Sequence, residues 1–177
     1  VPVRRKLMDE INWNDRLIGI KGCRGVGKTT FLLDYAREYF GADNRECLYI
    51  NLNQFCFSLR TLTDFANEFR EHGGKVLLLD QVFKYDGWSE ELRKCYDTIP
   101  DLKIVFTGSS VMRLKEENPI LSGRVKPYKL KGFSFREYLQ FVGVGSIAEK
   151  AGGTERNGVL QRHFNEYLRK GGFPMYL

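Results

Sequence analysis

The sequence is poor in the residues that build metal centres and disulfide frameworks. Its 177 residues include two histidines and four cysteines, and no two cysteines form a C-x-x-C pair. We therefore expect neither a zinc site nor a disulfide framework, and we interpret the cysteines as free thiols in a reducing cytoplasm.

Long apolar runs are also missing. No stretch approaches the length of a membrane span, and the basic start at 1–6 has no apolar core behind it, so neither a membrane segment nor a secretory signal is expected. The length suits one domain with a sizeable core, or a core plus a small appendage. The start at Val1 and the apolar end at 175–177 predict a fragment of a longer protein.

The most specific pattern present is a glycine-rich octapeptide, Gly22-Cys23-Arg24-Gly25-Val26-Gly27-Lys28-Thr29. It reads G-x-x-x-x-G-K-T, the loop whose backbone N–H groups surround the phosphates of a nucleoside triphosphate. Lys28 places a positive charge at the β- and γ-phosphates, and the Thr29 hydroxyl is a ligand for Mg²⁺. An apolar run at 16–21 and helical spacing at 29–40 predict the strand, loop and helix that this motif requires.

Strand and helix signals then alternate, which favours a parallel sheet covered on both faces. Further strands are expected at 47–52, 75–80, 103–108 and 126–131, the last at an edge because it contains Pro127. Further helices are expected at 58–72, from an N-cap at Ser89 to Thr98, at 111–117, from a capping box at Ser134 to Phe141, and at 161–170. The glycine-rich stretch 143–158 is expected to be flexible.

Asp80 ends an apolar strand, where its carboxylate would face the crevice at the carboxyl end of the sheet. We interpret it as the partner of Thr29 at Mg²⁺; an aspartate that opens a turn is the alternative.

Gln81 follows Asp80 in the sequence. An amide can orient a water molecule, but its oxygen is barely basic and cannot take a proton. The pair therefore predicts nucleotide binding with slow or altered hydrolysis.

Two further positions are candidates for contact with the γ-phosphate. Thr107 or Ser109, after the strand 103–108, can sense that phosphate by hydrogen bonding, or Ser109 and Ser110 can serve as helix caps. Arg124 can reach a γ-phosphate in its own or a neighbouring subunit, which would imply a homo-oligomer. An exposed arginine in a basic region is the equally simple interpretation.

Positive charge is concentrated in one stretch. The whole chain carries a formal net charge of +6, and 103–136 alone holds eight basic residues against Glu116 and Glu117. Such an excess can steer a polyanion, either the nucleotide or DNA. A solvated surface is the simpler interpretation of such charges. Because aromatic stacking positions are not interleaved with them, we favour the nucleotide together with a solvated face, and keep DNA association as an alternative.

Taken together, these pieces resemble the AAA-type ATPases of bacteria and archaea whose ATPase domain precedes a C-terminal region of unknown function. The resemblance covers nearly the whole chain, and its later pieces carry the specificity. The matching pieces are 22–30, 77–80, Lys84-Tyr85, Trp88, 106–110, Ser122-Gly123-Arg124, 133–139 and 171–174.

The resemblance implies a three-layer α/β core at 1–132 with a parallel five-stranded sheet of order 5-1-4-3-2, followed by the truncated start of a helical lid at 133–177. It implies ATP and Mg²⁺ as cofactors, with Thr29 and Asp80 at the metal. It implies Lys28 and Thr29 at the nucleotide, a polar sensor at Thr107 to Ser109, and Arg124 at the place of an arginine finger. Together with the loop motif, the candidate nucleotide contacts are Gly22, Cys23, Arg24, Gly25, Val26, Gly27, Lys28, Thr29, Thr30 and Ser109. The candidate catalytic residues are Lys28, Asp80, Gln81 and Arg124. The chain departs from the family at Gln81, where the family has Glu, and at Phe83, where it often has His.

The leading hypothesis is therefore a cytoplasmic ATPase domain that couples Mg-ATP binding and hydrolysis to conformational change. A nucleotide-responsive binding module with negligible hydrolysis and a DNA-associated protein are the alternatives.

Overall fold

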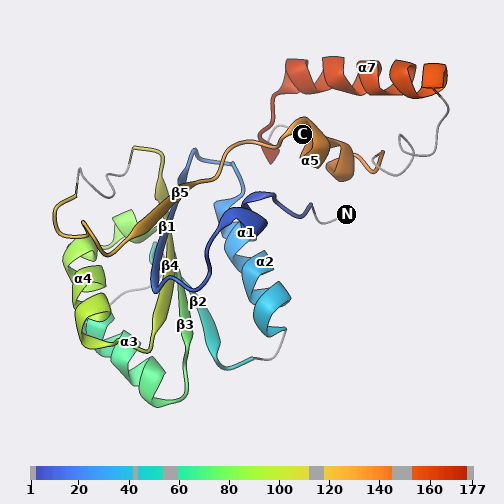
Figure 1. Cartoon of the computed structure of the whole chain (residues 1–177). Helices are drawn as coiled ribbons and strands as arrows, with labels where there is room; N and C mark the ends of the chain where they lie inside the picture. Colours follow the sequence, from blue (N-terminus) through green and yellow to red (C-terminus); the bar gives the residue numbers. More distant parts are fainter. Residues whose placement is uncertain (1–2, 42–43, 54–59, 112–117, 145–152, 175–177) are drawn as a thin grey trace.

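A five-stranded parallel sheet forms the centre of the molecule (Figure 1). The computed structural model describes residues 3–41, 44–53, 60–111, 118–144 and 153–174. The strands are β1 (Leu17–Gly22), β2 (Cys47–Asn51), β3 (Val76–Asp80), β4 (Lys103–Ser109) and β5 (Lys126–Lys129). Their order is β2-β3-β4-β1-β5, and every neighbouring pair is parallel. Counted from β5, this confirms the predicted order 5-1-4-3-2, with β5 at an edge.

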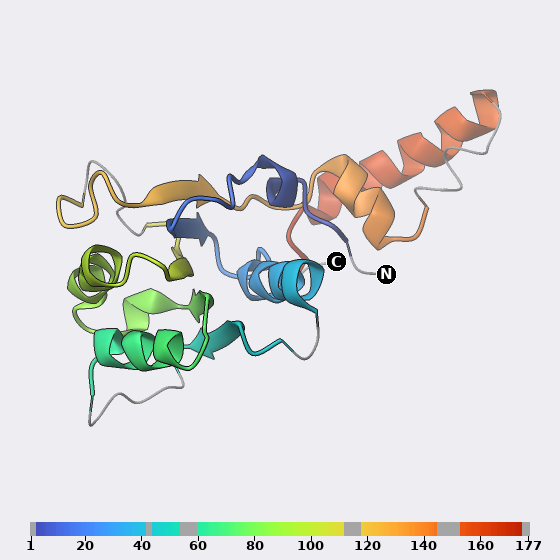
Figure 2. The same ribbon diagram turned by 60° about the horizontal axis from the view of Figure 1, so that its bottom comes forward.

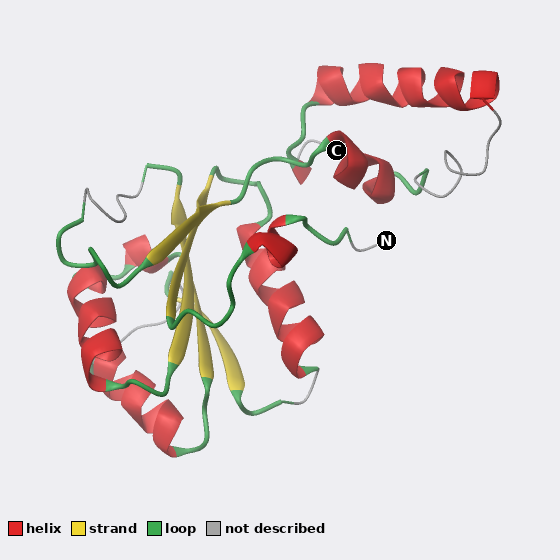
Figure 3. Ribbon diagram, in the orientation of Figure 1, coloured by secondary structure: helices red, strands yellow, loops and turns green. Residues whose placement is uncertain are grey.

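Helices cover both faces of the sheet, which completes the predicted three-layer arrangement (Figures 1 and 3). α1 (Leu7–Glu10) and α2 (Lys28–Phe40) lie on one face, and α3 (Leu62–Glu71) and α4 (Trp88–Thr98) lie on the other. Because side chains alternate along a strand, β3 sends Leu78 into the core under α2, and Leu77 and Leu79 into the core under α3 and α4. A strand covered on both sides is apolar throughout, which explains the run 76–79.

The start of α4 differs from the prediction. The helix begins at Trp88, after Gly87 in the left-handed conformation (φ 76°), so the prediction that Ser89 caps it is wrong. The chain enters α4 through the 3-10 turn η1 (Val82–Lys84), and the Trp88 N–H donates to the Tyr85 carbonyl at 3.2 Å. This turn places Ser89 inside the first helical turn, where its hydroxyl accepts from the Asn118 amide at 3.0 Å.

The last helix also differs. α7 (Gly153–Lys170) begins well before Gln161, so 153–158 of the stretch expected to be flexible are helical, and 145–152 lie outside the described residues. A glycine inside a helix costs only about 1 kcal/mol, and the packed turns from Leu160 onward outweigh that cost.

In α3, the Thr61 hydroxyl accepts from the Asp64 N–H at 3.2 Å and caps the helix. The first two residues of the helix predicted at 58–72, and 112–117 of the one predicted at 111–117, lie outside the described residues.

Two helices lie apart from the sheet, beyond the carboxyl ends of its strands (Figures 1 and 2). α5 (Phe135–Phe141) packs against α7 through a small core around Phe133, Tyr138 and Leu139. The capping box predicted at the start of α5 is present in both halves. The Glu137 N–H donates to Ser134 Oγ at 3.2 Å, and the Ser134 N–H donates to Glu137 Oε1 at 3.1 Å. In the part of the chain that the structure describes, no helix has both the length and the apolar character needed to cross a membrane.

Candidate functional site

The glycine-rich segment forms the loop between β1 and α2, at the carboxyl end of the sheet (Figure 1). Gly25 (φ 77°) and Gly27 (φ 98°) adopt backbone conformations that side chains with a Cβ rarely take. Gly22 is required for a different reason, because a Cβ there would lie 2.7 Å from the Leu130 carbonyl oxygen. The three glycines thus allow a tight turn whose N–H groups can converge on an anion at the start of α2.

Lys28, at the start of α2, spans this turn. Its ammonium donates to the carbonyl oxygens of Gly22 and Cys23, each at 2.8 Å. Burial lowers the pKa of Lys28, because the surroundings disfavour its charge, and Asp80 partly opposes this shift. A positive charge held at the mouth of the loop is available for phosphate oxygens.

Asp80, at the end of β3, is the most tightly held polar group near the loop. It is 1% exposed, and three hydroxyl groups donate to its carboxylate. Thr29 Oγ1 and Tyr49 OH lie 2.5 Å and 2.8 Å from Oδ2, and Thr107 Oγ1 donates to Oδ1. The carboxylate therefore already lies against the hydroxyl with which it would share a cation.

Tyr49 was not identified from the sequence. In the register of the sheet it pairs with Leu78, and Asn51 pairs with Asp80. Tyr49 and Asp80 therefore share the face that α2 covers. Burial and the hydrogen bond to Asp80 raise the pKa of Tyr49 to about 12, so the phenol stays protonated as a donor. Its place in β2, next to the strand that ends at Asp80, becomes evident only from the strand order.

Gln81 has an unusual backbone. Its φ of 56° and ψ of 48° are left-handed, and it is the one non-glycine residue with positive φ among those described. Its N–H donates to Thr107 Oγ1 at 3.1 Å. Thr107 is fully buried, with its hydroxyl engaged by Asp80 and Gln81. Of the two candidate sensors, Ser109 is the one that lines the open cavity.

An open cavity of about 870 Å³ lies beside the loop. It brings together the predicted residues Arg24, Gly25, Gly27, Lys28, Thr29, Thr30, Asp80, Gln81 and Ser109. Sequence reasoning did not identify Asn53, Phe83, Lys84 and Pro174 as further lining residues. Gly22, Cys23 and Val26 belong to the loop but are not part of the lining within the described residues. The cavity thus gathers most of the candidate site at one end of the sheet.

A second cavity of about 280 Å³ adjoins the first, because Gly27, Thr30 and Pro174 line both. Phe31 on α2 and Phe133 and Phe141 at α5 make it largely apolar. Asp34 on α2 adds a carboxylate, whose pKa is raised by burial although Arg37 opposes the shift. The second cavity therefore combines aromatic side chains with one carboxylate, next to the loop.

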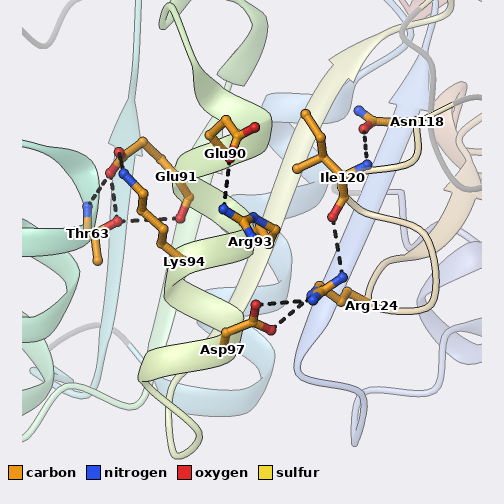
Figure 4. Close-up of polar contacts among 9 residues, drawn as sticks. All are labelled: Thr63, Glu90, Glu91, Arg93, Lys94, Asp97, Asn118, Ile120 and Arg124. Carbon is orange, nitrogen blue, oxygen red and sulfur yellow. Dashed lines mark hydrogen bonds and ion pairs between the residues drawn. The ribbon is translucent and has the colours of Figure 1, made fainter.

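Arg124 is not brought to this site. β5 runs parallel to β1, and Lys126 pairs with Ile18 near the amino end of β1, so Arg124 lies at the amino ends of the strands, opposite to the loop. Its Nε and Nη2 donate to the Asp97 carboxylate at 2.9 Å and 3.1 Å (Figure 4). This contact holds the pKa of Asp97 below its ordinary value. The structure does not place Arg124 at the loop of its own chain, and the alternative of a neighbouring subunit stays a prediction.

The residues near the loop suit a hard cation shared with a ligand. Within the described residues, no group of three or more His, Cys, Asp and Glu side chains could hold a metal ion. Thr29 and Asp80 instead offer two oxygen atoms 2.5 Å apart, which is chemistry that Mg²⁺ accepts when phosphates and water complete its shell. The donor set therefore fits Mg²⁺ bound together with a nucleotide.

A phosphate loop between a parallel strand and a helix, opposite a buried aspartate on another strand, defines a P-loop nucleotide-binding fold. The family model described as an AAA domain matches residues 14–139, which is most of the chain. The chain belongs to this family, and so is an AAA-type, ATPase-like nucleotide-binding domain. No curated protein matches it.

Proposed function

We propose that this domain binds ATP with Mg²⁺ at the carboxyl end of the sheet and hydrolyses it slowly. One observation carries the proposal: Thr29 Oγ1 lies 2.5 Å from Asp80 Oδ2, directly beside the loop. The loop hydroxyl and the strand carboxylate thus meet at one point, as a cation shared with β- and γ-phosphate oxygens requires. When bound, Mg²⁺ would neutralise charge that develops on those oxygens.

The chain's own residues would bind the phosphates and the cation and orient the attacking water. Lys28 would bind phosphate oxygens, and Thr29 and Asp80 would hold the cation. Ser109 would donate to the γ-phosphate, and Gln81 would orient the attacking water without taking its proton. The second cavity would receive the base, with the Asp34 carboxylate accepting from the exocyclic amino group of adenine.

We further propose that 133–177 acts as a lid on a nucleotide-binding core at 1–132. Phe133 and Phe141 line the second cavity together with α2 of the core, so a base bound there would touch both parts. Filling the site would then favour one position of α5 and α7, which is how binding could be coupled to conformational change.

A binding module that responds to nucleotide is the second candidate, and Gln81 is the observation that favours it. Without a carboxylate at this position, proton transfer from the water lacks a base. Single-turnover hydrolysis separates the two. Release of phosphate that Asp80→Asn abolishes would support the enzyme, and tight binding without release would support the module.

Lys28→Ala tests the site itself. Losing a charge-assisted contact worth about 1.5–3 kcal/mol should weaken ATP binding about 10- to 100-fold in calorimetry. Thr29→Ala should weaken the Mg²⁺ dependence of binding more than the binding of metal-free ATP. Equal ATP affinity of Lys28→Ala and the parent would refute the assignment of the loop.

A further inference from the structure

Arg5 joins segments that are far apart in the sequence. It precedes α1, and its side chain is 7% exposed. Nη1 donates to the Val26 carbonyl at 2.9 Å, Nη2 donates to the Lys131 carbonyl, and Nε lies 2.5 Å from Glu137 Oε2. The guanidinium also lies over the Phe133 ring, 4.7 Å from its centroid. One buried cation therefore contacts the phosphate loop, the segment after β5 and the helix α5.

The contact with Val26 bears on how the loop receives an anion. A trans peptide is planar, so its C=O and N–H point in opposite directions. Arg5 Nη1 donates to the Val26 carbonyl and so fixes the direction of this C=O. The N–H of Gly27 in the same peptide therefore points away from Arg5, and Gly27 lines the cavity beside Lys28.

The Val26–Gly27 peptide keeps this orientation only if another group stabilises it. Gly27 has φ 98°, and a glycine accepts several backbone conformations at little cost. A flipped peptide would present a carbonyl oxygen to the phosphates in place of an N–H donor, and the oxygen would repel them. Arg5 opposes the flip by occupying the carbonyl from the outside.

Glu137 extends the connection to α5. One of its oxygens is paired with Arg5, and the other accepts from the Ser134 N–H in the capping box at 3.1 Å. The first turn of α5 is thus bound to the same guanidinium that fixes the loop peptide. A shift of α5 would move Glu137 away from Arg5. A movement of the Val26 carbonyl would in turn displace the guanidinium that pairs with Glu137.

We propose that Arg5 is a positioning residue that sets the Val26–Gly27 peptide for phosphate binding and couples it, through Glu137, to the position of α5. The inference rests on the proposed function, because it requires a phosphate group in the loop. The contrasting interpretation is a buried ion pair that contributes to folding alone, since removing one partner of such a pair is destabilising wherever it lies.

Inorganic triphosphate with Mg²⁺ is the probe that separates these interpretations. It has no base, so it can fill the loop without entering the second cavity and touching Phe133 or Phe141 directly. Its affinity is measured by calorimetry, and its effect on 135–141 by amide hydrogen exchange. Thermal melting without ligand reports the stability of each variant.

Three variants complete the design. Arg5→Lys keeps the charge but loses the fork of donors. Glu137→Gln removes the anion, while glutamine can still close the capping box. Arg4→Met is the matched control, because it removes the neighbouring cation, which pairs with Asp9 and Glu38 at the surface.

In the parent, triphosphate should slow exchange in α5. Arg5→Lys should weaken triphosphate binding about tenfold, the effect of losing one hydrogen bond to a charged group. Glu137→Gln should bind triphosphate but lose the slowing in α5, and Arg4→Met should match the parent in both.

The inference is overturned if Arg5→Lys binds triphosphate like the parent, if Glu137→Gln retains the slowing in α5, or if the variants change only their melting temperature. Failure of the parent to bind ATP and triphosphate would overturn the proposed function as well. Parental binding with no effect of Arg5→Lys would overturn this inference alone.

Discussion

Gln81 illustrates how one residue fixes the geometry after β3. A non-glycine residue in the left-handed region costs roughly 1–2 kcal/mol, and Gln81 occupies it with φ 56°. The buried Thr107 hydroxyl accepts its N–H and helps to hold this conformation. Because the backbone sets where the side chain begins, a glutamate at this position would start from the same place beside Asp80 and the cavity.

Replacing Gln81 with glutamate should therefore raise the rate of hydrolysis. A carboxylate supplies the missing general base, a contribution of roughly 10²–10⁴-fold where the geometry is in place. ATP affinity should change little, because this side chain acts on the attacking water. Single-turnover assays with calorimetry measure both, and Asp80→Asn should remove the gain. An unchanged rate for Gln81→Glu would show that the base lies elsewhere or that a partner must complete the site.

Tyr49→Phe tests the phenol that donates to Asp80 Oδ2 at 2.8 Å. Without this hydrogen bond the carboxylate is less firmly oriented, so the Mg²⁺ concentration that half-saturates ATP binding should rise by about tenfold. Binding of metal-free ATP should stay near the parent value. Calorimetry over a range of Mg²⁺ concentrations is the measurement, with Tyr39→Phe on the exposed face of α2 as the control. Identical Mg²⁺ dependence in Tyr49→Phe and the parent would argue against this role.

At the scale of elements, one carboxylate joins α3 to α4. Glu91 on α4 is buried, and its Oε2 accepts from the Thr63 N–H at 3.0 Å and from the Thr63 hydroxyl at 2.6 Å, in the first turn of α3 (Figure 4). Lys94 pairs with its other oxygen at 3.3 Å. Burial raises the pKa of Glu91. The hydrogen bonds from Thr63 and the nearby ammonium of Lys94 lower it by more, so that the pKa lies below its ordinary value of 4.5.

The sign of this shift predicts how stability responds to acid. A carboxyl with a depressed pKa in the folded state contributes stability above its unfolded value, and this contribution is lost as pH falls through the folded value. Melting temperatures from neutral pH to about pH 3 should therefore fall less steeply below pH 4.5 in Glu91→Gln than in the parent. Glu90→Gln, in an exposed pair with Arg93, should keep the parent's slope. The same slope in Glu91→Gln and the parent would contradict the prediction.

At the scale of the whole molecule, the candidate site and Arg124 lie at opposite ends of the sheet's strands. The loop follows the carboxyl end of β1, and Arg124 precedes the amino end of β5. A contact between Arg124 and a γ-phosphate therefore requires a second copy of the chain, in which Arg124 would exchange Asp97 for the ligand. Asp97 would then keep the guanidinium paired until subunits meet.

Arg124→Ala should leave ATP affinity nearly unchanged and lower turnover only at protein concentrations where subunits associate. The reason is that the guanidinium would stabilise charge on a neighbour's phosphate without touching the nucleotide of its own chain. Turnover measured over a range of protein concentrations tests this, with Arg93→Ala on α4 as the control. A rate that does not depend on concentration, equally low in parent and variant, would leave Arg124 as a surface arginine paired with Asp97.

The sequence by itself determined the parts that rest on short spacings. The octapeptide 22–29 predicted the turn between β1 and α2, and Ser134 and Glu137 predicted the start of α5. The alternation of apolar runs with helical spacing predicted a covered parallel sheet. The turn and the helix cap form between neighbouring residues, and the apolar runs record locally that a strand will be covered on both faces. Where a local signal competed with a tight turn, as at Ser89, the prediction was wrong.

Only the tertiary structure decided which distant side chains meet. Tyr49 reaches Asp80 across 31 positions, Arg124 reaches Asp97 across 27, and Arg5 reaches Lys131 across 126. Such contacts depend on strand register, on which face of the sheet a side chain takes and on how the chain returns beside the loop. A single sequence does not encode these in any short spacing. The sheet brings its carboxyl ends together, and packing then selects the residues that surround the loop.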